Sequence, residues 1–219
     1  MKKYFYLLLS TTLLSSCTSI IMNTLIKDAR VENTASIKKF QLDNKFDTSF
    51  SFIAKADTAT AMKWIEKGLS SFDIYNTKGE RLDFIGNTGC GGLQFDYFLQ
   101  SHLDSFKINN TNTLQKVLDS CYNYQNKKTI LKNLPITDFY IVVYWSKFAG
   151  KKFGYKENVT EMENEIKNDT LKKHSITLLK INTDLQESWG MQPKGKMSVK
   201  LKVKKREGNF VFGALPIKK

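Results

Sequence analysis

An unbroken run of aromatic and aliphatic residues at positions 139–145 constrains the fold of this chain more than any other stretch. It reads Phe-Tyr-Ile-Val-Val-Tyr-Trp and contains no charged side chain. A strand with one face in water alternates apolar and polar residues, because successive side chains point to opposite faces. A run without this alternation is typical of a strand buried on both faces, in the middle of a sheet that helices cover. The sequence therefore predicts an α/β fold.

The elements that follow this run predict parallel pairing. A helix with an inward face at residues 159–166 leads to a second apolar strand at residues 176–181. Strand, helix and strand in this order imply two parallel strands with a right-handed crossover. A short helix or turn at residues 182–190 comes next. The chain then predicts an antiparallel hairpin of residues 199–204 and 210–215, which reverses at Glu-Gly-Asn.

The chain before this run predicts a smaller α+β region at residues 37–102. Its clearest element is a hairpin at residues 71–85, because Asn and Gly lie between two strand-like segments. A helix with an apolar stripe is expected at residues 95–106, with His102 on the stripe as a packed residue rather than a ligand. The glycine-rich loop before this helix is interpreted as a connector that holds Cys90.

Between these two regions, a short strand at residues 106–108 and a helix at residues 112–122 are expected. The helix begins with a capping-box-like Asn and Gln, and its buried face includes Cys121. From this strand onward, the order of elements resembles that of a known protein family.

The stretch from Tyr144 to Lys152 resembles the end of a strand and the active loop of thioredoxin-like proteins. The order of elements over residues 103–215 is also the order of that family. The resemblance implies a thioredoxin-like mixed sheet, flanked by helices, in a domain of residues 103–219. Where the family carries its C-x-x-C pair, this chain has no sulfur, so the resemblance implies a scaffold that cannot exchange thiols and disulfides. The residues of this degenerate active loop are Trp145, Ala149, Gly150, Lys151 and Lys152.

The N-terminus has the pattern of a secretory signal. Lys2 and Lys3 precede an apolar run at residues 4–14, which is shorter than the roughly 20 residues needed to span a bilayer. An N-terminal transmembrane helix is therefore not expected. A signal of this kind predicts a protein exported from the cytoplasm.

Residues 14–17 read Leu-Ser-Ser-Cys and resemble the lipobox of bacterial lipoproteins. The resemblance implies a signal peptide of residues 1–16, acylation of Cys17, and a lipid-anchored tether of residues 17–36. We expect a membrane-anchored protein of the cell envelope, on the periplasmic or surface face of the outer membrane rather than on the inner membrane. The alternatives are an ordinary signal peptide with a chance cysteine, or a buried apolar N-terminus.

The chain has three cysteines, and acylation of Cys17 would leave Cys90 and Cys121 as a pair. In an oxidising compartment the natural pairing is a Cys90–Cys121 disulfide. Closing this loop would stabilise the fold by roughly 3 kcal/mol in the chain-entropy model. The alternative is two buried thiols, because free cysteine is commonly buried.

The net charge of +13 predicts an anionic partner. For an envelope protein these partners are phospholipid headgroups, lipopolysaccharide or wall polymers, and nucleic acid is not expected. The basic stripe that we assign to an anionic surface is Lys200, Lys202 and Lys204, which alternate with apolar residues and so share one face of a strand. The alternatives are a lysine-rich composition without a partner, and an edge strand guarded by charge.

The sequence shows no catalytic constellation. The two histidines lie apart, no nucleophile motif occurs, and Glu161, Glu163 and Glu165 fall on the solvated face of the expected helix. We expect no catalytic residue, no metal and no cofactor. The predicted function is a non-catalytic binding or assembly module that holds an envelope protein or an anionic polymer. The alternative is a thiol–disulfide redox protein that uses Cys90 and Cys121.

Overall fold

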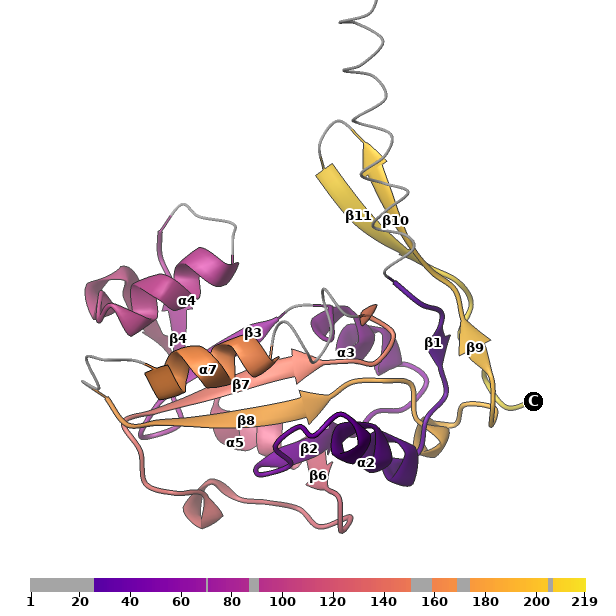
Figure 1. Ribbon diagram of the computed structural model, residues 1–219, viewed down its shortest axis with the longest axis horizontal. Helices are drawn as coiled ribbons and strands as arrows, with labels where there is room; N and C mark the ends of the chain where they lie inside the picture. Colours follow the sequence, from indigo (N-terminus) through magenta and orange to yellow (C-terminus); the bar gives the residue numbers. More distant parts are fainter. Residues whose placement is uncertain (1–25, 70, 87–90, 151–158, 169–173, 205–206) are drawn as a thin grey trace, which may run out of the picture.

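The computed structural model describes residues 26–69, 71–86, 91–150, 159–168, 174–204 and 207–219. Within these ranges, a seven-stranded mixed sheet with the order β5-β4-β3-β7-β8-β2-β6 forms the centre of the molecule (Figure 1). Its strands are β2 (Ser51–Ala54), β3 (Phe72–Asn76), β4 (Arg81–Phe84), β5 (Phe106–Asn109), β6 (Cys121–Asn123), β7 (Phe139–Trp145) and β8 (Ile176–Asn182). The α-helices are α2 (Thr34–Asp43), α3 (Ala61–Lys67), α4 (Gly91–Leu99), α5 (Leu114–Asp119) and α7 (Thr160–Asn168).

The central strand is β7, as its sequence predicts. Every residue of β7 is buried, and β8 pairs with it in parallel from Phe139↔Ile176 to Trp145↔Asn182. The connection between these two strands contains α7. The expected parallel strand–helix–strand unit is therefore confirmed, and the chain has an α/β fold.

Alternate residues of β7 pack into different cores. Tyr140, Val142 and Tyr144 face the core beneath α3 and α5, whereas Val143 and Trp145 face the core formed with α2 and the start of α7. Figure 1 shows α2 and α7 on the same face of the sheet. Burial of each large apolar side chain stabilises the fold by about 1.5–3 kcal/mol, so a strand between two cores contributes on both of its faces.

The strands of the two halves of the chain interleave in this sheet. β3 pairs antiparallel with β7, and β2 pairs in parallel with β8. The regions predicted at residues 37–102 and 103–219 thus share one sheet. The expected tether is also shorter than residues 17–36, because Ile26 and Ala29 are buried and the chain from Ile26 onward packs against the rest of the fold.

The hairpin near the C-terminus forms a separate two-stranded sheet. β10 (Val199–Lys204) and β11 (Glu207–Phe212) pair antiparallel from Val199↔Phe212 to Lys204↔Glu207. The hairpin is thus confirmed, but its second strand begins at Glu207 instead of the expected residue 210. Another small sheet joins β1 (Ala29–Arg30) to β9 (Lys196–Met197), directly before β10. In Figure 1 β10 and β11 project from the body of the molecule.

The first hairpin, β3–β4, lies where the sequence predicts it. Gly79 has a φ of +76° and permits the tight reversal, and the Asn76 side chain accepts hydrogen bonds from the backbone N–H groups of Lys78 and Glu80. No helix among the described residues is both long and apolar enough to cross a membrane.

The helix expected at residues 95–106 ends earlier, at Leu99. Ser101 has a φ of +64°, and the backbone N–H groups of Ser101 and His102 bond to the carbonyls of Phe98 and Tyr97. These two bonds form a Schellman motif, which terminates a helix. His102 is consequently exposed instead of packed on an apolar stripe, and its ring contacts Tyr97 at 5.4 Å between centroids.

The helix expected at residues 112–122 is α5, which ends at Asp119. Cys121 therefore begins β6 and does not lie on a helix face. Remaining short elements are the 3-10 turns η1 (Leu103–Ser105), η2 (Leu131–Asn133) and η4 (Glu187–Trp189), the last of which is the helical turn expected after β8.

Candidate functional site

The ladder between β3 and β4 stops after two residue pairs, and a fork opens between the strands. Ile74 pairs with Leu82, and Tyr75 pairs with Arg81. The next position would bring Asp73 opposite Asp83. Like charges directly opposite each other destabilise an antiparallel pair, so these two carboxylates need a cation between them.

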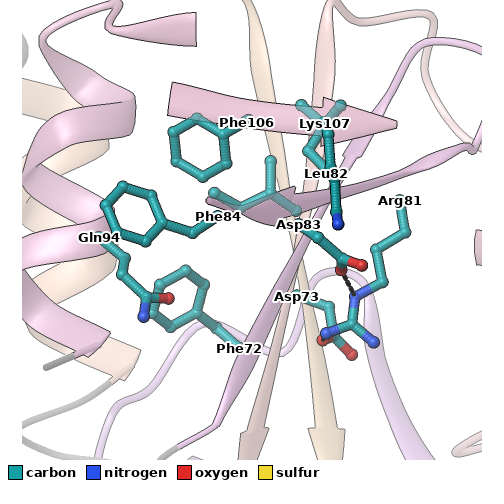
Figure 2. A pocket seen from close by; sticks show the side chains of 10 residues that line it. Phe72, Asp73, Arg81, Leu82, Asp83, Phe84, Gln94, Phe106 and Lys107 are labelled. Carbon is teal, nitrogen blue, oxygen red and sulfur yellow. Dashed lines mark ion pairs between the residues drawn. The ribbon is translucent and has the colours of Figure 1, made fainter. Parts of the chain in front are cut away.

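Arg81 holds the two carboxylates of the fork. Its Nη2 lies 3.1 Å from Asp73 Oδ1, and its Nε lies 2.9 Å from Asp83 Oδ1. The Nε contact is an ion pair without a well-directed hydrogen bond. Figure 2 shows the guanidinium between the carboxyl groups. Asn109 Nδ2 also donates to Asp83 Oδ2 at 2.7 Å, so Asp83 has partners on both oxygens.

Asp73 is anchored to the sheet by Tyr144. The Tyr144 hydroxyl donates to Asp73 Oδ2 at 2.7 Å, and Lys67 Nζ lies 3.4 Å from the same oxygen. Lys67 Nζ also lies 4.2 Å from the centroid of the Tyr144 ring. Burial, and then the Asp73 carboxylate, raise the pKa of Tyr144 well above its usual range, so this hydroxyl keeps its proton and remains a donor.

A cavity of about 400 Å³ occupies the fork. Aromatic side chains line it on one side and charged side chains on the other (Figure 2). Because both carboxylates already pair with Arg81, the fork offers fixed charges and hydrogen-bonding groups rather than a free acid or base. Such a cavity suits recognition more than catalysis. Its lining residues are Phe72, Asp73, Ile74, Arg81, Leu82, Asp83, Phe84, Gln94, Phe106 and Lys107.

A second cavity, of about 560 Å³, lies beyond the carboxyl ends of β7 and β8. Ligands of open α/β sheets commonly bind outside the carboxyl ends of parallel strands. The loop after β7, which corresponds to the predicted degenerate active loop, contributes Lys147 and Phe148. We call this space the strand-end cavity; its lining residues are Lys27, Asp28, Arg30, Glu32, Phe40, Lys147, Phe148, Asp184 and Lys196.

Asp184 is the buried acid of the strand-end cavity. Its side chain accepts hydrogen bonds from the Lys147 backbone N–H, at 3.0 Å to each oxygen, and from Asn182 Nδ2 at 2.7 Å. Burial outweighs these bonds and raises the pKa of Asp184 to about 6. Beside it, Lys147 Nζ and Glu32 Oε1 form an ion pair of 2.6 Å.

The structure places part of the predicted active loop. Trp145 and Ala149 are completely buried, and Gly150 has a φ of +74°. Lys151 and Lys152 lie outside the described residues. The Phe148 carbonyl accepts a hydrogen bond of 2.9 Å from the Lys27 backbone N–H, which ties the N-terminal part of the fold to this loop.

The cysteines differ from the predicted disulfide pair. Cys121 is a free thiol and only 2% exposed, and burial raises its pKa. For Cys121 alone this corresponds to the alternative interpretation of the sequence, two buried thiols, and the pairing with Cys90 stays a prediction. Cys90 and Cys17 lie outside the described residues.

The basic stripe of the hairpin has the predicted alternation as far as Lys202. Val199 and Leu201 are buried, and Lys200 and Lys202 are exposed. Lys204 lies in β10, but its side chain is outside the described part of the structure. The binding of an anionic surface by this stripe stays a prediction.

One buried ionic cluster was not foreseen. Lys180, in the apolar strand β8, is 2% exposed, and its Nζ lies 2.9 Å from both Asp47 Oδ2 and Glu163 Oε1. The expectation that Glu163 is solvated, like Glu161 and Glu165, was therefore wrong, because α7 turns Glu163 toward the sheet, where it is 13% exposed. The signal in the sequence was a lysine within an apolar strand, which requires a nearby carboxylate.

The fork was also missed, although the predicted hairpin contained a signal for it. A two-residue period places Asp73 and Asp83 on the same face of adjacent strands, with Arg81 between them.

No family model matches this chain, and no curated protein or solved structure matches it.

Proposed function

We propose that this protein is a lipid-anchored lipoprotein of the cell envelope that acts as a non-catalytic binding or assembly module. Its scaffold is thioredoxin-like without the pair of thiols. Support for the scaffold comes from the order β7, α7, β8, η4 and a final hairpin. The hairpin belongs to a sheet of its own, so the likeness concerns the order of elements and the parallel β7–β8 pair.

The observation that carries the proposal is the place where the N-terminal segment enters the fold. Ile26 is buried, and Lys27 bonds to Phe148 at the carboxyl end of β7. The nine residue steps from Cys17 to Ile26 span at most about 30 Å when fully extended. A lipid on Cys17 would therefore keep this end of the sheet close to the membrane.

The basic hairpin lies at this same end. β1 pairs with β9, and β10 follows one residue later. We infer that Lys200, Lys202 and Lys204 contact anionic headgroups or envelope polymer. Each basic side chain near an anionic membrane contributes about 1 kcal/mol.

The fork cavity is lined in part by Gln94 of α4, a helix that Figure 1 shows well apart from the hairpin β10–β11. Its fixed charges and aromatic wall make it the surface that we propose for an envelope protein partner.

The alternative redox function has little support. Thiol–disulfide exchange needs an accessible thiolate, and Cys121 is buried with a raised pKa. No observation on the described residues favours this function over binding.

The proposal is tested by replacing Cys17 with Ser in the full-length protein. We expect the Cys17→Ser protein to carry no acyl chain by mass spectrometry and to remain a precursor that is not cleaved before residue 17. Ser19→Ala, two residues further on, is the matched control and should remain acylated and bound. Acyl groups on the Cys17→Ser protein would contradict the anchor. Density-gradient separation of the two membranes, with the wild-type protein, tests the expected outer-membrane position.

A further inference from the structure

The charges in the strand-end cavity are only partly balanced. Lys147 pairs with Glu32 at 2.6 Å, and Lys196 pairs with Asp28 at 3.5 Å. Each pair is neutral as a whole. The buried Asp184 is satisfied by hydrogen bonds from a backbone N–H and an amide, so it needs no cation from a ligand.

Two cations remain in this cavity. Lys27 and Arg30 are exposed, and neither forms an ion pair with any residue that the structure describes. The backbone fixes both positions, because β1 pairs with β9 and the Lys27 N–H bonds to Phe148. Among the described residues, the cavity thus presents two basic side chains, on fixed backbone positions, that form no ion pair.

The remaining wall is apolar. Phe40 and Phe148 line the cavity, and Lys147 Nζ lies 5.5 Å from the centroid of the Phe40 ring. A volume of about 560 Å³ is within the range of small-molecule sites. The cavity therefore combines cations for an anion with an apolar surface for the carbon skeleton next to it.

We propose that the strand-end cavity binds the phosphodiester headgroup of an anionic phospholipid, with Lys27 and Arg30 as the donors to the phosphate. The planar guanidinium of arginine matches phosphate oxygens, and lysine adds a point charge. This inference rests on the proposed lipid anchor, since the short span from Cys17 brings Lys27 near the membrane. A lipid is favoured over a soluble phosphate because the apolar wall and the basic hairpin lie at the same end of the molecule.

The test uses full-length protein purified in a neutral detergent, so that binding does not depend on membrane attachment. Dihexanoyl phosphatidylglycerol, dihexanoyl phosphatidylcholine and inorganic phosphate are titrated separately by calorimetry. We expect the phosphatidylglycerol to bind, the phosphatidylcholine to bind more weakly, and inorganic phosphate to bind weakest of the three. Replacing both Lys27 and Arg30 with Gln should weaken phosphatidylglycerol binding about thirtyfold, because each basic residue contributes about 1 kcal/mol.

The matched control replaces Lys63 and Lys128, two exposed lysines outside the cavity, with Gln. This control removes the same charge. Its affinity for phosphatidylglycerol should stay within about twofold of wild type, because surface substitutions away from a site have little effect. Unchanged binding by the Lys27→Gln/Arg30→Gln variant, with normal thermal unfolding, would overturn the proposal, as would absence of phosphatidylglycerol binding. Equal affinity for inorganic phosphate or for phosphatidylcholine would overturn a site specific for anionic lipid. Loss of acylation alone would contradict the anchor but not this site, because the assay is done in detergent.

Discussion

Some charged residues of this protein are buried at positions where the sequence pattern predicts apolar side chains. Lys180 is the clearest case, because it is buried in β8 between Asp47 and Glu163. Burial of a lone charge is strongly unfavourable, so each partner matters more than an ion pair on the surface would. The same argument applies to Asp184, whose buried carboxyl is held by hydrogen bonds.

Replacing Glu163 with Gln should destabilise the protein by about 2 kcal/mol, since Lys180 would keep its charge with only the half-exposed Asp47 as partner. Lys180→Met should cost less, because it removes the buried charge itself. Urea unfolding of each variant measures both changes in the free energy of unfolding. The exposed Glu161 on the same helix provides the control: Glu161→Gln should stay within about 0.5 kcal/mol of wild type. A Glu163→Gln protein as stable as this control would show that the cluster does not stabilise the fold.

The Asp184 carboxyl predicts a pH dependence of stability. Its pKa rises from an ordinary value of 3.8 to about 6 in the folded protein, so the folded state holds the proton more tightly than the unfolded chain. Stability from this group is therefore greatest at low pH and falls as pH rises from about 4 to about 6. Between about pH 4 and about pH 7, Asp184→Asn should gain roughly 3 kcal/mol relative to wild type. Unfolding at a series of pH values measures this difference, and Asp104→Asn, at an exposed carboxyl, should show no such gain.

The Cys121 thiol should react only when the protein opens. It is 2% exposed and its pKa is raised by burial, so alkylation at neutral pH is expected to be far slower in the folded protein than in urea. Peptide mapping by mass spectrometry follows Cys121 separately from the other two cysteines. Fast labelling of Cys121 in the folded protein would revive the redox function.

At the scale of elements, burial on both faces made β7 and β8 predictable, whereas the ends of helices were not. α4 ends in a Schellman motif whose left-handed residue is Ser101, where glycine is the usual signal. The sequence pattern therefore extended this helix to residue 106. Likewise, the spacing of apolar residues predicted that α5 includes Cys121, although a strand begins at this residue.

Ser101→Gly should stabilise the protein by about 1 kcal/mol, because glycine adopts a positive φ without strain. The Ser101 hydroxyl is also buried without a hydrogen bond, and Gly removes it. Ser101→Ala separates the two causes, since it removes the hydroxyl and keeps the Cβ. Thermal unfolding should rank Gly above Ala; the reverse order would contradict the argument from backbone strain.

The hairpin β10–β11 should bind anionic vesicles through its lysines. Changing Lys200, Lys202 and Lys204 together to Gln should weaken binding of the Cys17→Ser protein to phosphatidylglycerol vesicles, and wild-type hairpin binding should fall as salt rises. Cosedimentation with anionic and neutral vesicles provides the measurement. Equal binding to both vesicle types would leave the lysines as guards of an exposed strand edge.

At the scale of the whole molecule, the sequence predicted the fold class, the buried pair β7–β8 and both hairpins, but not how the strands meet. β2 lies between β8 and β6 although it is distant from both in the chain. Such long-range pairing depends on how faces fit in three dimensions, which the period of apolar residues does not encode. The strand-end cavity was missed for the same reason, since Arg30, Lys147 and Asp184 meet only through the pairing of β1, β7 and β8 with their neighbours.

The short span between Cys17 and Ile26 has a consequence for affinity. A lipid on Cys17 would confine the strand-end cavity to the membrane surface, where the effective concentration of headgroups is in the millimolar range. The strand-end cavity would then be occupied even with a dissociation constant near a millimolar. An affinity that weak lets the protein exchange one headgroup for another while its anchor stays in place, so the molecule could keep one orientation on the membrane as it moves laterally.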